Sequence, residues 1–132
     1  MKQPLVVTAV IEAGAGVAIL CFPSKMVELL LGFPLHERPS AALVRVAGAV
    51  LLALGVACWL ATRDAGKPSA RRMVTVMTAY NLSAATALGI IGVRAPSAGV
   101  LLWPTVALHA AMALWCIIGL LPKAAPSGKA AQ

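Results

Sequence analysis

Residues 41–61 read AALVRVAGAVLLALGVACWLA, and Arg45 is the only charged residue among them. A helix needs about 20 mostly apolar residues to cross the hydrocarbon layer of a membrane. Because lipid offers no hydrogen-bond partners, the backbone of a spanning segment must satisfy its own polar groups, which requires a helix unless strands close a barrel. This stretch therefore predicts a membrane-spanning helix.

Three further segments have the same character, so the sequence predicts an all-α, four-helix transmembrane bundle. The expected spans are residues 5–22, 41–61, 73–93 and 100–121. No run of about ten residues with alternating hydrophobicity supports a barrel. The spans form one domain over residues 1–122, and residues 123–132 are expected to be a disordered tail.

The overall composition points the same way. Of the 132 residues, 61% are hydrophobic and 11% are charged, whereas soluble domains are about 45–50% apolar and about 25% charged. These values exclude a soluble enzyme, a disordered chain and a disulfide-stapled module. Cys21, Cys58 and Cys116 lie in or beside apolar segments without metal-ligand spacing, so we expect thiols that pack as small hydrophobic groups and no metal site.

A short amphipathic segment, residues 25–31, lies between the first two spans. Ser24 is a candidate N-cap and Gly32 a candidate stop. The expected apolar side consists of Met26, Leu29 and Leu30, and the polar side of Lys25 and Glu28. The pattern predicts a short interfacial helix between spans one and two, and the alternative is a continuation of the first span that bends at Pro23.

The net charge of +7 is best explained by membrane orientation. Positive loops stay in the cytoplasm, and the side that holds both termini is the more positive one: it carries Lys2, Arg63, Lys67, Arg71, Arg72, Lys123 and Lys129, against Lys25, Arg38 and Arg94 on the other. Both termini are therefore expected to be cytoplasmic. No basic helix face interleaved with aromatic residues is present, so nucleic acid is not an expected partner.

Five polar residues inside the spans form the candidate ligand-binding or proton-binding site: Glu12, Arg45, Tyr80, Asn81 and His109. A charged group within a span costs roughly 2.5–3.5 kcal/mol on insertion scales and usually faces the bundle interior. A helical rise of about 1.5 Å per residue places Glu12, Asn81 and His109 in one layer and Arg45 nearer the outer edge.

Each of these residues also has a structural alternative. A protonated Glu12 can form a hydrogen bond with Asn81 or His109, and Tyr80 with Asn81 can hold helices together. Arg45 can extend to the headgroups or pair with Glu37. Small residues beside the polar ones, including Gly16, Gly48 and Gly55, predict close helix packing, and Pro104 predicts a kink that widens the bundle near Trp103.

The layout resembles the DoxX-like group of small bacterial four-helix membrane proteins. The resemblance covers residues 4–121 and rests on Arg45-Val-Ala-Gly48 followed by Leu51-Leu-Ala-Leu-Gly55. A similar uncharacterised bacterial set shares Glu12, Tyr80-Asn81, and Trp103-Pro104 followed by His109. The resemblance implies the bacterial cytoplasmic membrane and a link to quinone-dependent sulfur oxidation or to small subunits of membrane redox complexes. It transfers no catalytic residue.

The leading functional prediction is a small membrane protein, without the chemistry of a soluble enzyme, that binds a small amphipathic molecule, a quinone or a lipid, at the polar cluster. One alternative is an accessory or assembly subunit whose Gly- and Ala-rich faces dock on a membrane protein partner or a second copy. The other is a proton-coupled exporter, because Glu12 resembles the functional Glu of small multidrug resistance transporters. Arg45, and His109 if protonated, argue against such a cation site. No phosphate loop or nucleophile motif is present, and no cofactor is identified.

Overall fold

The computed structural model describes residues 2–35, 38–95 and 98–121. Its elements, in chain order, are α1 (Lys2–Cys21), α2 (Pro23–Leu31), α3 (Arg38–Ala61), the short 3-10 helix η1 (Thr62–Asp64), α4 (Pro68–Arg94) and α5 (Leu102–Leu120). Four of them, α1, α3, α4 and α5, are long and apolar enough to cross a membrane. This confirms the predicted all-α bundle with a short helix between spans one and two. The predicted tail, residues 123–132, lies outside the described residues.

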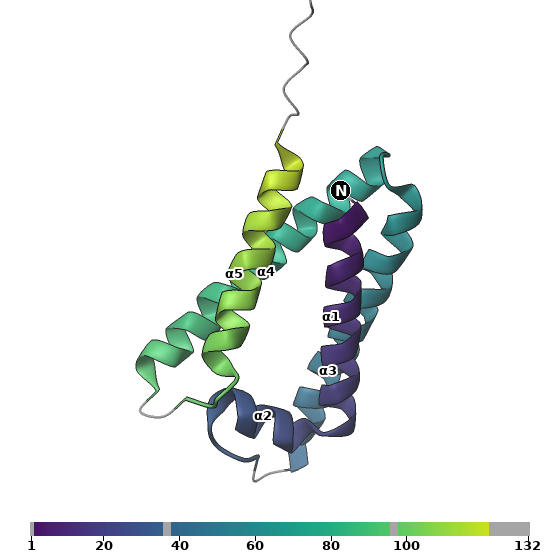
Figure 1. The fold of residues 1–132 in the computed structure, drawn as a ribbon. Coiled ribbons are helices and arrows are strands. Elements are labelled where there is room, and N and C mark those ends of the chain that lie inside the picture. The colour runs from purple at the N-terminus through teal and green to yellow at the C-terminus, as the bar shows by residue number, and fades with distance from the viewer. Residues whose placement is uncertain (1, 36–37, 96–97, 122–132) are drawn as a thin grey trace, which may run out of the picture.

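Figure 1 shows that the four long helices form two pairs. α1 packs along α3, and α4 packs along α5, while contacts between the pairs are few. The pairs converge where α1 and α4 begin and α5 ends, and they diverge toward the opposite end, where α2 lies between them. The bundle therefore has a closed end and a splayed end.

The α1–α3 pair is tight because glycines let the two backbones meet. A Cβ atom on Gly16 would lie 2.6 Å from the backbone nitrogen of Leu52, and one on Gly55 would lie 2.7 Å from that of Ala13. Small residues permit such approaches between membrane helices. The predicted close packing at Gly16, Gly48 and Gly55 is therefore present, and it is used within the chain. These three glycines are not available to a partner protein.

The closed end holds the apolar core. The core residues are Leu5, Ala9, Cys58, Ala70, Val74, Met77 and Cys116, which come from all four long helices. Arg71 also joins two helices there, because its Nη2 donates to the carbonyl oxygen of Leu120 at 2.7 Å. Cys58 and Cys116 are buried as expected, whereas Cys21 is exposed.

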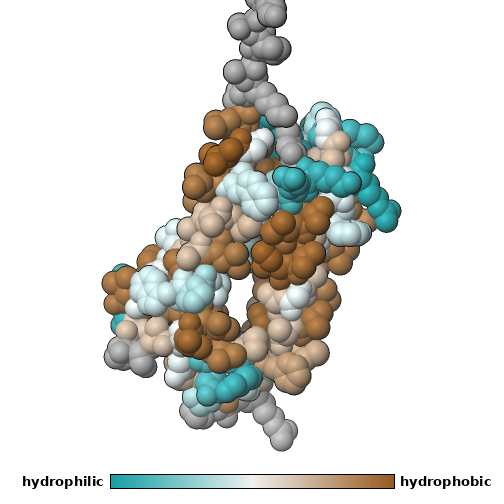
Figure 2. Space-filling model, viewed as in Figure 1, coloured by the Kyte–Doolittle hydropathy of each residue, from teal (hydrophilic) through white to brown (hydrophobic). Residues whose placement is uncertain are grey.

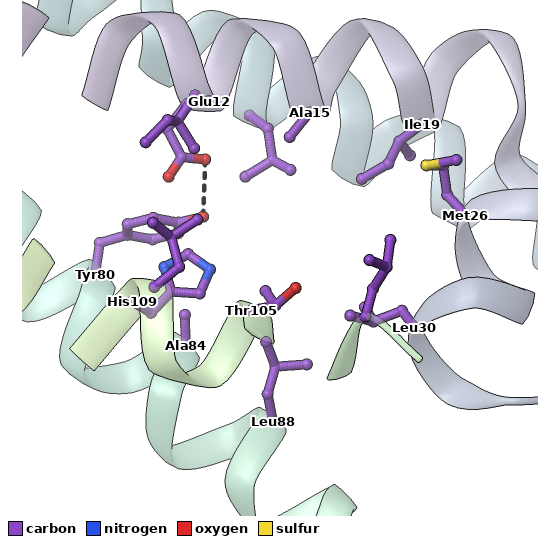
Figure 3. A pocket seen from close by; sticks show the side chains of 14 residues that line it. Glu12, Ala15, Ile19, Met26, Leu30, Tyr80, Ala84, Leu88, Thr105 and His109 are labelled. Atoms are coloured by element: carbon purple, nitrogen blue, oxygen red, sulfur yellow. Dashed lines mark hydrogen bonds between the residues drawn. The ribbon is translucent and has the colours of Figure 1, made fainter. Parts of the chain in front are cut away.

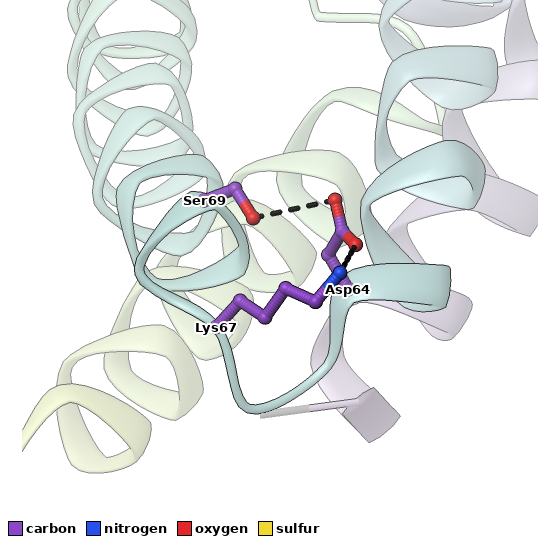
Figure 4. Close-up of polar contacts among 3 residues, drawn as sticks. All are labelled: Asp64, Lys67 and Ser69. Carbon is purple, nitrogen blue, oxygen red and sulfur yellow. Dashed lines mark hydrogen bonds and ion pairs between the residues drawn. The ribbon is translucent and has the colours of Figure 1, made fainter.

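A polar turn connects α3 to α4 at the closed end. The Asp64 carboxylate accepts hydrogen bonds from Lys67 Nζ at 2.8 Å and from Ser69 Oγ at 3.3 Å (Figure 4). Gly66 has a φ of 106°, which a residue with a side chain adopts only with strain. Pro68 then occupies the first turn of α4, where its missing N–H costs nothing. The helix thus begins at Pro68 rather than at the expected residue 73.

The helix α2 differs in its start from the sequence prediction. It begins at Pro23, after a break in the helical backbone at Phe22, and Ser24 does not cap it. Gly32 ends it as predicted, with a φ of 85° and an N–H that donates to the Glu28 carbonyl oxygen. Because the chain breaks at Phe22, α2 is a separate helix and not a continuation of the first span.

The predicted kink at Pro104 is absent, because α5 starts at Leu102 rather than at residue 100. Pro104 therefore lies in the first turn, whose N–H groups have no helical partner in any case. The divergence of the helix pairs, rather than a bend within α5, opens the splayed end.

Candidate functional site

A cavity of about 410 Å³ lies between the two helix pairs at the splayed end. Apolar side chains such as Ile19, Leu51 and Leu88 form most of its walls. Four polar residues complete the lining: Glu12, Tyr80, Thr105 and His109. In the space-filling view, a gap separates α1 from α5 above α2 (Figure 2). We refer to this part of the bundle as the cavity end.

Glu12 and Tyr80 join the two helix pairs across the cavity. The Tyr80 hydroxyl on α4 donates to Glu12 Oε2 on α1 at 3.0 Å (Figure 3). Glu12 is only 4% exposed, so its carboxyl group is withdrawn from lipid, as intramembrane ionisable groups usually are. Because the pairs have few other contacts, this hydrogen bond is a main polar link between them.

Asn81 and His109 form the second polar contact, which lies within the α4–α5 pair. Asn81 is buried and its Oδ1 lies 2.8 Å from His109 Nδ1. The His109 ring also packs edge-on against Tyr80, with 5.6 Å between ring centroids. Tyr80 thus contacts both Glu12 and His109, and all four residues form one continuous cluster.

The structure brings together four of the five predicted site residues. Glu12, Asn81 and His109 share one layer, as their expected depths in the membrane indicated, and Tyr80 connects them. Arg45 does not join them. It is exposed on α3, and its Nε donates to the Leu20 carbonyl oxygen at 3.4 Å. The predicted partner of Arg45, Glu37, lies outside the described residues.

Most of the lining residues were not predicted as part of the site, and three of them are informative. Thr105 lies one helical turn before His109 and so shares its face, a spacing that is visible in the sequence. Met26 and Leu30 were predicted only as the apolar side of an interfacial helix, and that side turns out to cover the cavity. The polar side of α2 carries the exposed ion pair of Lys25 and Glu28, with 3.0 Å between Nζ and Oε2.

A backbone contact holds α2 over the cavity. The N–H of Leu101, just before α5, donates to the Leu29 carbonyl oxygen at 2.9 Å. Neither Trp103 nor Pro104 lines the cavity, although Leu101 and Thr105 on either side of them do. Trp103 instead packs near Gly92, where a Cβ atom would lie 3.2 Å from its ring.

The arrangement of polar and apolar side chains around the cavity is suited to binding an amphipathic molecule. Within residues 2–35, 38–95 and 98–121, no group of three or more His, Cys, Asp or Glu side chains could hold a metal ion. Glu12, Tyr80 and His109 gather at one end of the cavity, Ile19, Met26 and Leu30 lie at the other, and Thr105 lies between them (Figure 3). This division matches a molecule with a polar head and an apolar body.

No protein-family model matches the chain, and no curated protein or solved structure matches it. The interpretation of the cavity therefore depends on its geometry and chemistry. Those features describe an integral membrane protein with an apolar cavity and one polar wall.

Proposed function

We propose that this protein binds a small amphipathic, membrane-soluble molecule, a quinone or a lipid, in the cavity between its two helix pairs. The observation that carries the proposal is the position of Glu12, Tyr80 and His109 at one end of a largely apolar cavity of about 410 Å³ (Figure 3). Ligand pockets typically measure about 300–1,000 Å³ and combine apolar walls with a few convergent polar groups.

The direction of the opening supports a ligand that arrives from the lipid. The gap in Figure 2 lies between α1 and α5, along the side of the bundle. α2 covers the end of the cavity with Met26 and Leu30. A molecule dissolved in the hydrocarbon layer reaches this gap directly, whereas a water-soluble molecule must first cross the covered end.

We place the protein in a bacterial cytoplasmic membrane, with both termini in the cytoplasm and with DoxX-like proteins as its relatives. Lys2, Arg63, Lys67, Arg71 and Arg72 all lie at the closed end of the described chain, and positive residues favour the cytoplasmic side. Reporter fusions after residues 64 and 97 test this topology. The fusion at residue 64 is expected to show cytoplasmic activity, and the fusion at residue 97 periplasmic activity.

The decisive experiment identifies what the protein carries from its own membrane. The full chain is purified in lipid nanodiscs, and its small-molecule content is compared with that of empty nanodiscs by mass spectrometry. We expect enrichment of one amphipathic compound. His109→Ala is expected to reduce this enrichment about tenfold, because it removes a polar contact worth about 1–3 kcal/mol when its partner is buried. Glu12→Gln, which keeps an oxygen for the Tyr80 hydroxyl but removes the carboxyl group, is expected to reduce the enrichment by a smaller factor.

Two matched substitutions test whether the compound binds in the cavity or elsewhere on the bundle. Ala84 lines the cavity and Ala87 is exposed on the same helix, so Ala84→Leu is expected to abolish enrichment and Ala87→Leu to preserve it. Arg45→Gln, outside the cavity, is also expected to preserve it. Equal enrichment in the wild type, Glu12→Gln and Ala84→Leu proteins would contradict the site. A stoichiometric second protein without any enriched compound would favour the accessory-subunit alternative.

A further inference from the structure

A buried amide controls the orientation of the His109 ring. Asn81 is 1% exposed, and both ends of its side-chain amide have partners. Its Nδ2 donates to the Met77 carbonyl oxygen at 2.8 Å, and its Oδ1 lies 2.8 Å from His109 Nδ1. Two short contacts hold the amide in one orientation.

This orientation determines which ring nitrogen carries the proton. A backbone carbonyl oxygen only accepts hydrogen bonds, so the NH₂ end of Asn81 must face Met77. The oxygen end therefore faces His109, and it also only accepts. The contact at 2.8 Å is a hydrogen bond only if His109 Nδ1 is the donor. The reverse orientation would place two carbonyl oxygens against each other.

The second ring nitrogen, Nε2, is consequently an acceptor. Among the described residues, no carboxylate lies within ion-pair distance of His109, and a charged imidazole inside a span is costly. A neutral ring with its proton on Nδ1 carries a lone pair on Nε2. No hydrogen bond to Nε2 occurs within the described part of the chain, and His109 lines the cavity.

The neighbouring Tyr80 side chain does not provide a hydrogen-bond donor for the ligand. The hydroxyl proton of Tyr80 is directed to Glu12, so it is not offered to a ligand. Thr105 can donate or accept, because its hydroxyl rotates. Two acceptor atoms of cavity-lining residues thus have no partner among the described residues, Nε2 of His109 and Oε1 of Glu12. Of these two, only Nε2 has its acceptor role determined by Asn81.

We propose that Asn81 is a positioning residue that makes His109 Nε2 a hydrogen-bond acceptor, so that the cavity selects amphiphiles with a hydroxyl head group over matching ethers or carbonyl compounds. This inference rests on the proposed function and narrows it. Phenols and alcohols with an apolar body, including the reduced form of a quinone, fit the site. The oxidised form, which offers only acceptors, leaves Nε2 without a partner.

A pair of probes that differ in one donor tests the selectivity. The affinities of 4-hexylphenol and of its methyl ether, 4-hexylanisole, are measured by equilibrium dialysis against the full chain in nanodiscs, with empty nanodiscs as the reference. The phenol is expected to bind at least about tenfold more tightly than the ether, because the ether leaves a buried acceptor unpaired. In Asn81→Leu the ratio is expected to fall to about threefold or less while both probes still bind. Arg45→Gln, which lies outside the cavity, is expected to keep the wild-type ratio.

The outcomes distinguish the two proposals. If both probes bind the wild-type protein equally, the cavity is a binding site but the selectivity inference is wrong. If neither binds above the empty nanodiscs, the proposed cavity function fails as well. A wild-type ratio that survives in Asn81→Leu would overturn the positioning role of Asn81, because the acceptor in the cavity would then not depend on it.

A spectroscopic measurement tests the inference without altering the cluster. The chain has two histidines, so His36→Gln leaves His109 as the only source of imidazole signals. In ¹⁵N-histidine-labelled protein, we expect a protonated Nδ1 and an unprotonated Nε2, and we expect 4-hexylphenol to shift the Nε2 resonance. A proton on Nε2 in the free protein would overturn the proposal, whether or not the Asn81 variant folds.

Discussion

The two ends of this bundle are both lined mainly by apolar side chains, but they differ in packing. At the closed end, Leu5, Val74 and Met77 are at most 1% exposed and contacts reach across all four long helices. At the cavity end, the same helices diverge around about 410 Å³ of empty space. Well-packed interiors contain few voids larger than a water molecule. The difference indicates that the closed end holds the fold together, so the cavity end can be left open for a ligand.

The largest expected effect comes from the backbone crossing that joins α1 to α3. In Gly16→Leu, the added Cβ would lie 2.6–2.7 Å from backbone atoms of α3, so the pair must separate. We expect the free energy of unfolding in mixed micelles to fall by about 3 kcal/mol or more. Gly14→Leu is the matched control, because its added Cβ meets nothing within 4 Å. Equal losses in the two variants would show that the crossing is not decisive.

Truncations on α4 test the contrast between the ends directly. Met77 is fully buried at the closed end, and Leu88 borders the cavity. Met77→Ala is expected to cost about 2 kcal/mol of unfolding free energy, at the lower end of the range for buried side chains, since lipid also provides contacts after helices separate. Leu88→Ala, which enlarges an existing cavity, is expected to cost about 1 kcal/mol or less. The reverse order would refute the division into two ends.

One buried hydroxyl group is expected to lower the stability of the otherwise well-packed closed end. Thr8 is 2% exposed, and its Oγ1 has no hydrogen-bond partner among the described residues. Thr8→Val is expected to raise the unfolding free energy by about 1 kcal/mol, because it replaces an unsatisfied polar group. In Thr78→Val, by contrast, the hydrogen bond from Oγ1 to the Val74 carbonyl oxygen is lost. The same measurement is then expected to show a small decrease.

The smallest effect is expected in the polar turn at the closed end. The hydrogen bond to Asp64 raises the pKa of Lys67 above its usual value. A raised lysine pKa stabilises the folded state fully below the unfolded pKa, about 10.4, and this contribution is lost as pH rises through the folded pKa. The melting temperature of the wild type should therefore be slightly higher than that of Lys67→Gln at pH 8. At strongly alkaline pH the two melting temperatures should be equal. If the difference in melting temperature persists at strongly alkaline pH, the ion pair between Lys67 and Asp64 is not its cause.

The sequence predicted the parts of the fold that depend on local chemistry. Runs of apolar residues located the four spans, and Gly32 located the end of α2. Boundaries were less accurate, because Pro68 and Pro104 can each lie within the first turn of a helix as well as before or inside it. The sequence also predicted that Glu12, Asn81 and His109 lie in one layer. Because the rise per residue of a helix is fixed, the position of a residue in its span gives its depth in the membrane.

Other features of the site depend on how helices are turned toward one another. Arg45 shares a stripe of α3 with Gly48 and Gly55, and this stripe faces α1 rather than the α4–α5 pair. Arg45 therefore lies beside the end of α1, where it contacts Leu20, and outside the cavity. The cover provided by Met26 and Leu30 depends on the contact between Leu29 and Leu101. Such long-range contacts leave no local pattern in the sequence.

By itself, the sequence determined that this protein spans a membrane four times and that a few polar residues are buried there, because hydropathy and helical rise act locally along the chain. Only the tertiary structure decided that α1 with α3 and α4 with α5 form separate pairs, and that the space between them is a cavity. The orientation of Asn81, and through it the acceptor at His109, also came from contacts with Met77 and between two helices. Contacts between the helices determine which polar groups are paired with each other and which can accept a hydrogen bond from a ligand.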